Sequence, residues 1–186
     1  MSARGHVDTT SKAAWETMRE QNYGRIVLTT SGSALYGNFG QANYGAAKAA
    51  MVGLMNVLAA EGQKNDIRVN ALAPTAAARM TAGILEPQTA SLMAPEAITP
   101  AVLMLVCQDA PSRMILAAGA GCYAVTRILE TEGIYLPESE RTPEAIEARL
   151  AQMTDMAGAH LIGSAFEQTD RYVRKAAAAS GIQLSG

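Results

Sequence analysis

The sequence RIVLTTSGSALYGNFGQANYGAAK, from Arg25 to Lys48, decides the fold. Residues 25–30 form a short run rich in β-branched side chains, and its length and composition are typical of a buried parallel strand. A loop rich in Ser, Gly and Asn follows to about Gln41, and the alanine-rich residues 42–63 favour one long helix. A strand that leads through a loop into a helix is half of a parallel α/β unit.

The segments on either side continue this rhythm. Residues 7–21 carry apolar side chains such as Trp15 and Met18 at helical spacing, which predicts an amphipathic helix just before the strand. Residues 66–72 (DIRVNAL) predict the next strand, and we expect Ala73-Pro74 to end it because proline cannot continue a hydrogen-bonded ladder. The order helix, strand, long helix, strand predicts an α/β fold with a parallel sheet.

The rest of the chain divides into a continuation of this core and a helical part. Residues 95–107 predict a helix, and residues 114–118 predict a further strand. From Thr142 the pattern changes to a capping threonine, a proline at the first helical position and apolar residues at helical spacing. We therefore expect a core over residues 1–135 and a helical extension over residues 136–186.

Composition and charge restrict the partners. The chain has 186 residues, of which 49% are hydrophobic and 17% charged, enough apolar material for a packed core. A formal net charge of -2, without a run of Lys or Arg, predicts neither a nucleic-acid partner nor an anionic membrane surface. The amino terminus does not resemble a signal peptide, and we expect no window of ~20 apolar residues that would span a membrane. Cytoplasmic localisation is the resulting expectation.

The cysteines and histidines do not predict a metal centre. Cys107 and Cys122 stand in apolar surroundings without metal-ligand spacing, so we expect reduced, buried thiols rather than a disulfide or a metal site. His6 and His160 have no convergent partners in the sequence and favour structural roles.

Three side chains of the opening stretch can act together chemically. Tyr44 and Lys48 are four residues apart, so they lie on one helix face, about 6 Å apart along its axis. A nearby ammonium group lowers the pKa of a tyrosine by stabilising the phenolate, so Lys48 would prepare Tyr44 for proton transfer. Ser31 stands at the carboxyl end of the preceding strand, where open parallel sheets bind ligands. Its hydroxyl can orient a substrate carbonyl or alcohol while a nicotinamide moves a hydride.

The spacing of these residues resembles one enzyme family. Ser31 stands thirteen positions before Tyr44, Lys48 follows four later, and the next strand closes with Asn70-Ala-Leu-Ala-Pro74. This stretch resembles the short-chain dehydrogenase/reductase family. Within it, TSGSALYGNFGQANYGAAK and VNALAPTAAARMT resemble the (3R)-hydroxyacyl-CoA dehydrogenase part of the peroxisomal multifunctional enzyme and its bacterial relatives, as does the tail beginning TPEAIEARL. The resemblance extends from roughly residue 4 to residue 175.

The resemblance implies a role for each residue of the set. Tyr44 is implied as the catalytic acid/base, Lys48 as the residue that lowers its pKa and binds ribose, and Ser31 as the hydroxyl that orients the substrate. Ser33 is a second-choice hydroxyl. Tyr36 is open between two interpretations, a wall of the substrate pocket and a packed aromatic.

The same resemblance implies NAD or NADP as the cofactor. The residues implied to contact it are Tyr44, Lys48, Pro74, Thr75 and Thr81. Thr75 stands where many relatives have glycine. A dinucleotide site also needs a glycine-rich turn between a strand and a helix, and the glycine clusters at 37–40 and 119–121 follow the wrong elements.

Against the family pattern, the chain corresponds to the carboxyl-terminal half of a Rossmann-type parallel sheet with a helical carboxyl-terminal extension. We therefore expect an NAD(P)-dependent oxidoreductase that interconverts a secondary alcohol, such as a 3-hydroxyacyl-CoA, and a ketone, and that needs the missing cofactor-binding half. The expected partners are a small-molecule substrate of the CoA thioester type and either a second copy of the chain or a complementing chain. The alternative is a non-catalytic scaffold or partner subunit derived from this family.

Overall fold

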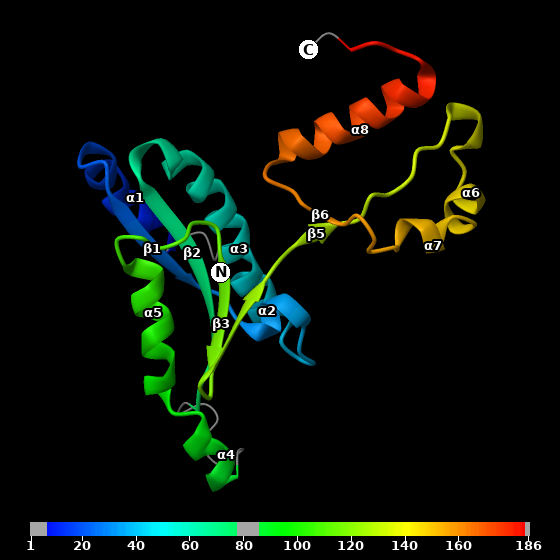
Figure 1. Cartoon of the computed structure of the whole chain (residues 1–186). Helices are drawn as coiled ribbons and strands as arrows, with labels where there is room; N and C mark the ends of the chain where they lie inside the picture. Colours follow the sequence, from blue (N-terminus) through cyan, green and yellow to red (C-terminus); the bar gives the residue numbers. More distant parts are fainter. Residues whose placement is uncertain (1–6, 78–85, 185–186) are drawn as a thin grey trace. The chain divides into compact units, whose positions relative to one another are not determined.

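The chain folds as two compact units, Met1–Thr126 and Arg127–Gly186, in a computed structural model that describes residues 7–77 and 86–184 (Figure 1). The boundary expected after residue 135 lies inside the second unit. Each unit has its own sheet, one of four strands and one of two.

The first unit alternates helices with strands. The strands are β1 Gly24–Thr29, β2 Ile67–Thr75, β3 Ile115–Gly119 and β4 Cys122–Thr126. The helices are α1 Val7–Glu20, α2 Gly32–Tyr36, α3 Ala42–Gly62, α4 Pro87–Leu92 and α5 Thr99–Val106, with 3-10 turns at Gln63–Asn65 and Pro95–Ile98. The predicted helix–strand–helix–strand order over residues 7–72 is therefore confirmed, with ends that differ by a few residues.

The four-stranded sheet has the order β1-β2-β3-β4. β1, β2 and β3 are parallel, whereas β4 returns antiparallel to β3. The register of the first pair runs from Gly24 opposite Ile67 to Thr29 opposite Leu72. Among the described residues no strand pairs with the outer side of β1, so β1 is an edge strand there.

Helices cover both faces of this sheet (Figure 1). On one face the buried side chains of α3, including Met51 and Met55, pack against Leu28 and Val69 of the strands. On the other face, Leu105 of α5 is buried in a cluster that includes Leu72, Leu116 and Ala118. Neighbouring strand residues belong to opposite clusters because side chains alternate across a sheet. This layered arrangement confirms the expected α/β fold with a mainly parallel sheet.

Pro74 does not end β2, contrary to our expectation. The strand continues to Thr75, and Pro74 lies opposite Ala118 of β3. Leu72 accepts a hydrogen bond from the Thr30 N–H and so faces β1, and alternation along the strand turns Pro74 to the same side. β1 has already ended at that level, so no ladder bond on that side needs the N–H that proline lacks.

Two further elements of the first unit are not predicted by the sequence patterns. The predicted loop after β1 contains the short helix α2, and β4 follows β3 through a tight turn. All residues of β4 but the last are exposed, so they lack the alternation that reveals a half-buried strand.

The expectation about the cysteines is wrong in part. Cys122 lies on β4 and Cys107 lies at the end of α5, and both thiols are free, as expected, but exposed rather than buried.

The expectation that no stretch would be apolar enough to span a membrane is wrong. Pro87–Val106 has 20 residues and a mean hydropathy of 1.5, which by length and composition would let a helix cross a membrane. The stretch is formed here by α4, a 3-10 turn and α5, with prolines at three helix starts. Ala101 and Leu105 of α5 are buried against the sheet, and 17% of the apolar window is buried. The stretch is therefore weak support for a membrane span, and cytoplasmic localisation stays a prediction.

Gly119 gives a first testable prediction about this sheet. A β-carbon at Gly119 would lie 2.4 Å from the carbonyl oxygen of Thr75, where the two strands are paired. We expect Gly119→Ala to force β2 and β3 apart and to lower the free energy of unfolding by about 1–3 kcal/mol, measured by urea denaturation. Gly53→Ala is the matched control, because that helical glycine has no atom within 4 Å of the new methyl group. Equal stability of the two variants would contradict the close approach.

The second unit is built from short elements and one long helix. These are β5 Leu129–Glu130, a 3-10 turn at Glu138–Glu140, α6 Pro143–Glu147, α7 Leu150–Met153, β6 His160–Leu161 and α8 Ala165–Ser180. Thr142 caps α6 by accepting the N–H of Ala145, which confirms the predicted helix start. The expected single helical pattern is instead split into α6 and α7, and β5 pairs with β6.

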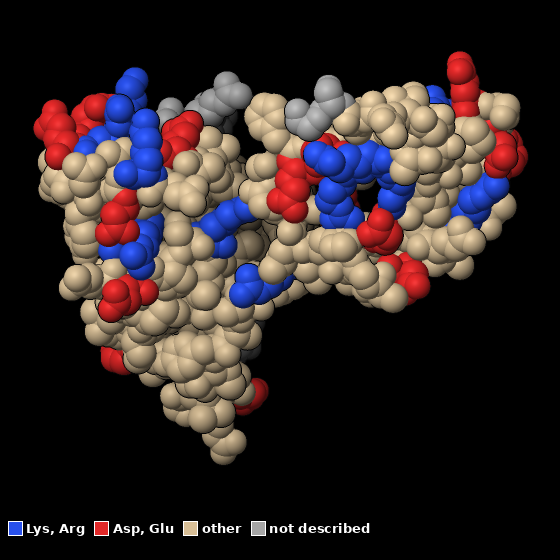
Figure 2. Space-filling view, turned by 45° about the horizontal axis from the view of Figure 1, so that its top comes forward, with Lys and Arg blue, Asp and Glu red and all other residues tan. Residues whose placement is uncertain are grey.

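Glu132 is the centre of an ion-pair network in the second unit. Its carboxylate is 2.7 Å from Lys175 Nζ, 2.7 Å from His160 Nε2 and 3.2 Å from Arg171 Nη2. The hydrogen bond from Lys175 and then that from His160 lower the pKa of Glu132 from 4.5 to about 2. On the face drawn in Figure 2, basic side chains are likewise flanked by acidic ones. The network joins β6 and α8 to the segment that follows β5.

The lowered pKa of Glu132 predicts a pH effect with a definite sign. Because the folded-state pKa lies below the ordinary value of 4.5, the stabilisation is complete above that value and is lost as the pH falls towards about 2. We expect Glu132→Gln to lower the thermal midpoint at about pH 6 and to have no effect near about pH 2. Circular dichroism of both proteins over this range measures the difference. A difference that stays constant with pH would contradict the ion-pair account.

Candidate active site

The candidate site lies at the carboxyl end of β1. Ser31 follows this strand directly and caps α2, its Oγ accepting the Ser33 N–H at 3.2 Å. Ser31 and Ser33 are both half-buried. The main chain of α2 lies close to α3, since a β-carbon at Gly45 would be 3.3 Å from the Ser33 carbonyl oxygen. A glycine next to Tyr44 thus allows α2 and α3 to approach each other.

Lys48 is held against the end of β1 by two hydrogen bonds. Its Nζ donates to the carbonyl oxygen of Thr29 at 3.1 Å. Its own carbonyl oxygen accepts the hydroxyl of Thr30 at 2.9 Å. Thr30 is only 1% exposed, and the sequence patterns did not single it out. The structure therefore connects Lys48 with the two residues that immediately precede Ser31.

Tyr44 lies one turn before Lys48 on α3 and is 39% exposed. Its backbone N–H donates to Asn43 Oδ1 at 2.8 Å, so Asn43 accepts one N–H of the first helical turn, whereas the N-cap residue Gln41 makes no side-chain bond to the helix. Within the described parts of the chain no side chain hydrogen-bonds the Tyr44 hydroxyl. That hydroxyl is therefore available to a ligand.

The second strand end carries Pro74 and Thr75. Pro74 is half-buried and Thr75 is exposed, and they lie opposite Ala118 and Gly119 of β3. Thr81, the third residue implied to contact a cofactor, lies outside the described residues. β1 and β2 are parallel neighbours, so Ser31, which lies just beyond β1, and Thr75, the last residue of β2, are at the same edge of the sheet.

Tyr36 and Phe39 are exposed aromatics in the segment between Ser31 and Tyr44. Tyr36 is 73% exposed, and its hydroxyl lies 2.8 Å from Thr126 Oγ1 at the end of β4. This exposure contradicts the interpretation of Tyr36 as a packed aromatic and leaves the pocket-wall interpretation as a prediction. Phe39 is fully exposed, and the sequence patterns did not single it out.

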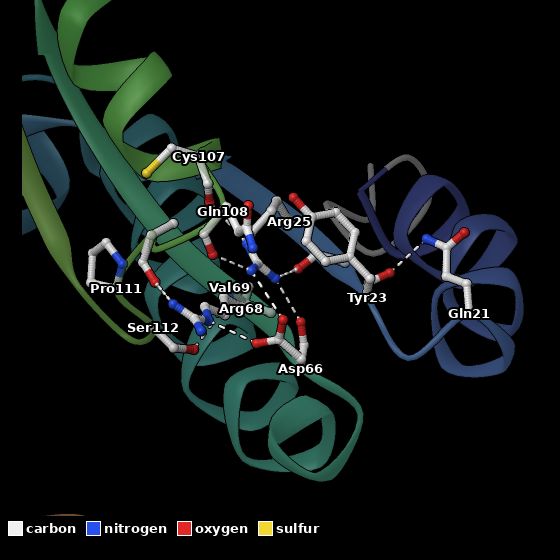
Figure 3. Close-up of polar contacts among 12 residues, drawn as sticks. Gln21, Tyr23, Arg25, Asp66, Arg68, Val69, Cys107, Gln108, Pro111 and Ser112 are labelled. Atoms are coloured by element: carbon white, nitrogen blue, oxygen red, sulfur yellow. Dashed lines mark hydrogen bonds and ion pairs between the residues drawn. The ribbon is translucent and has the colours of Figure 1, made fainter.

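At the opposite, amino-terminal end of the strands, Arg25 is the centre of a polar cluster (Figure 3). Its side chain is 5% exposed and donates to the carbonyl oxygens of Gly24, Asp66, Cys107 and Gln108 at 2.5–3.1 Å. It also lies 3.1 Å from the Asp66 carboxylate and 4.2 Å from the centre of the Tyr23 ring. Hydrogen bonds from Arg68 and then from Arg25 lower the pKa of Asp66. These bonds have a structural role, far from the candidate site.

A metal centre finds no support in the parts of the chain that the structure describes. No group of three or more His, Cys, Asp or Glu side chains converges there. His160 pairs with Glu132, which gives it the structural role expected from the sequence. Asn70 is fully buried and has a structural role too, because its amide donates to the Pro111 carbonyl and accepts the Met114 N–H.

Comparison with known proteins agrees with this geometry. Residues 3–88 match the family described as short chain dehydrogenase. The chain is 44% identical over 144 residues to peroxisomal multifunctional enzyme A of Dictyostelium discoideum, an alignment that covers 77% of the chain. By these matches the chain is similar to the short-chain dehydrogenase family. It also shares 44% identity over 148 residues, 78% of its length, with the peroxisomal hydratase-dehydrogenase-epimerase of Saccharomyces cerevisiae.

A solved structure extends the likeness to the fold of the chain. The full-length peroxisomal multifunctional enzyme type 2 of Drosophila melanogaster matches 92% of the chain with a TM-score of 0.79 and 31% identity. The chain spans only part of these proteins: 32% of the Dictyostelium protein, 16% of the yeast protein and 32% of the Drosophila chain. The description of the matching family and the name of the yeast protein both include dehydrogenase.

The side chains of Tyr44 and Lys48 have the donor chemistry that ribose hydroxyls need. Both residues lie on α3, and Lys48 Nζ lies at the end of β1. The turn at Gly119–Gly121 joins two antiparallel strands, so no helix begins there to bind a pyrophosphate.

Proposed function

We propose that this chain supplies the proton-transfer site of an NAD(P)-dependent oxidoreductase that interconverts a 3-hydroxyacyl-CoA, or a similar secondary alcohol, and its ketone. The observation that carries the proposal is the position of Lys48, whose Nζ is bonded to the Thr29 carbonyl oxygen at the end of β1. One turn earlier on the same helix lies Tyr44, whose hydroxyl has no partner among the described residues. The name of the yeast relative, hydratase-dehydrogenase-epimerase, supports a dehydrogenase reaction. The name of a further relative, acetoacetyl-CoA reductase, supports the 3-ketoacyl thioester as a substrate class.

In the proposed reaction, the chain's own residues move and orient a proton. The Ser31 hydroxyl donates a hydrogen bond to the carbonyl oxygen of the ketone and holds it near Tyr44. The Tyr44 hydroxyl gives its proton to that oxygen as the alcohol forms, and it takes the proton back in the reverse direction. The Lys48 ammonium group stabilises the phenolate that remains. The bound cofactor supplies the hydride.

We propose the cofactor contacts implied by the family for this chain too: Tyr44 and Lys48 at the ribose, and Pro74, Thr75 and Thr81 at the nicotinamide. Pro74 and Thr75 lie at the carboxyl end of β2, which supports this assignment. The choice between NAD and NADP depends on residues that bind the adenosine half.

We further propose that a segment or chain with a pyrophosphate loop completes the sheet at β1. The unpaired outer side of β1 among the described residues supports this, because an edge strand offers N–H and C=O groups to a further strand.

A second copy of the chain would pack against α1 and α3. Between these helices lies a cavity of about 300 Å³ lined by Trp15, Leu54 and Leu58, with Lys12 and Glu61 at the same opening.

The experiment supplies the cofactor-binding half as a separate chain, taken from the corresponding segment of the Dictyostelium relative. NADH or NADPH oxidation with a 3-ketoacyl-CoA is then followed by absorbance. We expect turnover that needs both chains and the thioester. Calorimetry with the cofactor is the control, since a complemented pair that binds NAD(P) but gives no turnover would contradict the proposal.

A non-catalytic role as a scaffold or partner subunit is the second candidate. The hairpin at Gly119–Gly121, which cannot hold a pyrophosphate as a strand–helix turn does, favours it. Calorimetry of the isolated chain distinguishes the two. Binding of NAD or NADP at micromolar affinity, about -8 kcal/mol, would exclude an inert chain.

A further inference from the structure

Thr30 is a buried polar residue where the fold would accept an apolar one. It is 1% exposed, and it lies two residues beyond Leu28, on the face of the sheet that packs against α3. Ile26 and Leu28 of β1 contribute only apolar contacts to that face. A valine would have the same shape as threonine, so packing alone does not require the Thr30 hydroxyl.

The Thr30 hydroxyl makes one hydrogen bond, to the Lys48 carbonyl oxygen at 2.9 Å. Lys48 is in the interior of α3, where a carbonyl already accepts the N–H four residues later. The helix does not need this extra bond for its own hydrogen bonding. Its effect is to connect the helix turn that carries Lys48 to the end of β1.

Thr30 is itself fixed to the sheet. Its N–H donates to the Leu72 carbonyl oxygen at 2.8 Å, which extends the pairing of β1 and β2 one residue beyond the end of β1. A buried side chain on a hydrogen-bonded main chain is a rigid point of attachment. The position of Lys48 therefore depends on β2 as well as on β1.

Lys48 is consequently held at both of its ends by consecutive residues. The Thr29 carbonyl oxygen accepts the ammonium group at 3.1 Å, and the Thr30 hydroxyl donates to the main chain. The next residue, Ser31, carries the hydroxyl proposed to orient the substrate. Three successive residues thus combine one contact to the lysine side chain, one to its backbone and one proposed to the substrate.

We propose that Thr30 is a positioning residue for proton transfer. It fixes the turn of α3 that carries Tyr44 and Lys48 relative to the strand end that carries Ser31. The inference rests on the proposed function for its catalytic consequence, because the bonds by themselves set only the geometry. A misplacement of reacting groups by about 1 Å can lower a rate by about 10²-fold, so such a tie affects turnover more than stability.

The test compares Thr30→Val, which keeps the shape and removes the donor, with Thr30→Ser, which keeps the donor. In the complemented enzyme we expect Thr30→Val to lower kcat by about 10- to 100-fold with KM almost unchanged. Thr30→Ser should stay within about threefold of the wild-type kcat. Equal losses in both variants would show a packing role and overturn the proposal, as would a Thr30→Val kcat equal to that of the wild type.

A second readout does not depend on turnover. The rate at which acetic anhydride acetylates Lys48, measured by peptide mass spectrometry, reports how firmly its ammonium group is held. We expect it to rise severalfold in Thr30→Val and not in Thr30→Ser, at equal thermal midpoints. An unchanged rate in Thr30→Val overturns the positioning. If the acetylation rate rises in Thr30→Val but the complemented wild type shows no turnover, the positioning is upheld and the proposed function is refuted.

Discussion

Tyr44→Phe is expected to lower the NAD(P)H-dependent reduction of a 3-ketoacyl-CoA by the complemented chain by about 10²- to 10⁴-fold, the usual contribution of general acid–base catalysis. The substitution removes only the hydroxyl that donates the proton. That hydroxyl has no hydrogen-bond partner among the described residues, so the fold loses no contact there. Steady-state rates at saturating substrate, together with an unchanged thermal midpoint, measure this effect.

The matched control is Tyr172→Phe. Tyr172 lies on α8 in the second unit and is 57% exposed, compared with 39% for Tyr44. The same chemical change there should leave the rate within about twofold, because surface substitutions outside a site have small effects. If Tyr44→Phe retained the wild-type rate, the proton would come from another group.

Arg25→Met is expected to have the largest effect on stability, a loss of about 3–5 kcal/mol in the free energy of unfolding, as for removal of one partner from a buried ionic network. The loss comes from the carbonyl oxygens that Arg25 joins across β1, the start of β2 and the segment after α5. The charge of Asp66 contributes less, because its side chain is 43% exposed and solvent screens it. Urea denaturation followed by circular dichroism measures the change.

Arg19→Met is the control for Arg25→Met. Arg19 is 44% exposed and pairs with Glu16 at 3.1 Å on the same helix, so its loss should cost at most about 1 kcal/mol. Because ordinary domains have only about 5–15 kcal/mol of stability, the two results are easy to separate. Similar small losses of unfolding free energy in both variants would mean that the Arg25 cluster does not stabilise the fold.

The main elements could be predicted because their signals are local. The composition of the β-branched run at 25–30 indicates a strand, and that of the alanine-rich run at 42–63 indicates a helix. Both elements formed as expected. α2 could not be predicted, since a five-residue helix between Gly32 and Gly37 depends on the Ser31 cap and on packing against α3. β4 could not be predicted either, because its mostly exposed residues do not alternate between apolar and polar.

Pro74 shows where a correct rule gives a wrong boundary. Proline does interrupt a ladder, but only on the side to which its nitrogen points. That side depends on where the neighbouring strand ends, and β1 ends at Thr29, one residue before the level at which a bond to Pro74 would be needed. The residues of β2 alone do not indicate where β1 ends.

The candidate site divides in the same way. The spacing of Ser31, Tyr44 and Lys48 could be found in the sequence because all three lie within one strand–loop–helix unit. The roles of Thr30 and Arg25 could not be found there. A threonine in a strand indicates only β-branching, and Arg25 bonds to carbonyl groups as far away as Gln108. The catalytic roles themselves stay predictions.

The most direct test of the central claim follows the hydride and the proton together. The complemented chain is given a 3-ketoacyl-CoA and NADH or NADPH that carries deuterium on the transferable carbon, and the thioester product is analysed by mass spectrometry. We predict a 3-hydroxyacyl-CoA with one deuterium on carbon 3 from the wild-type chain and almost none from Tyr44→Phe. A folded, cofactor-binding pair that gives no deuterated product, or equal amounts with Tyr44→Phe, would contradict the account.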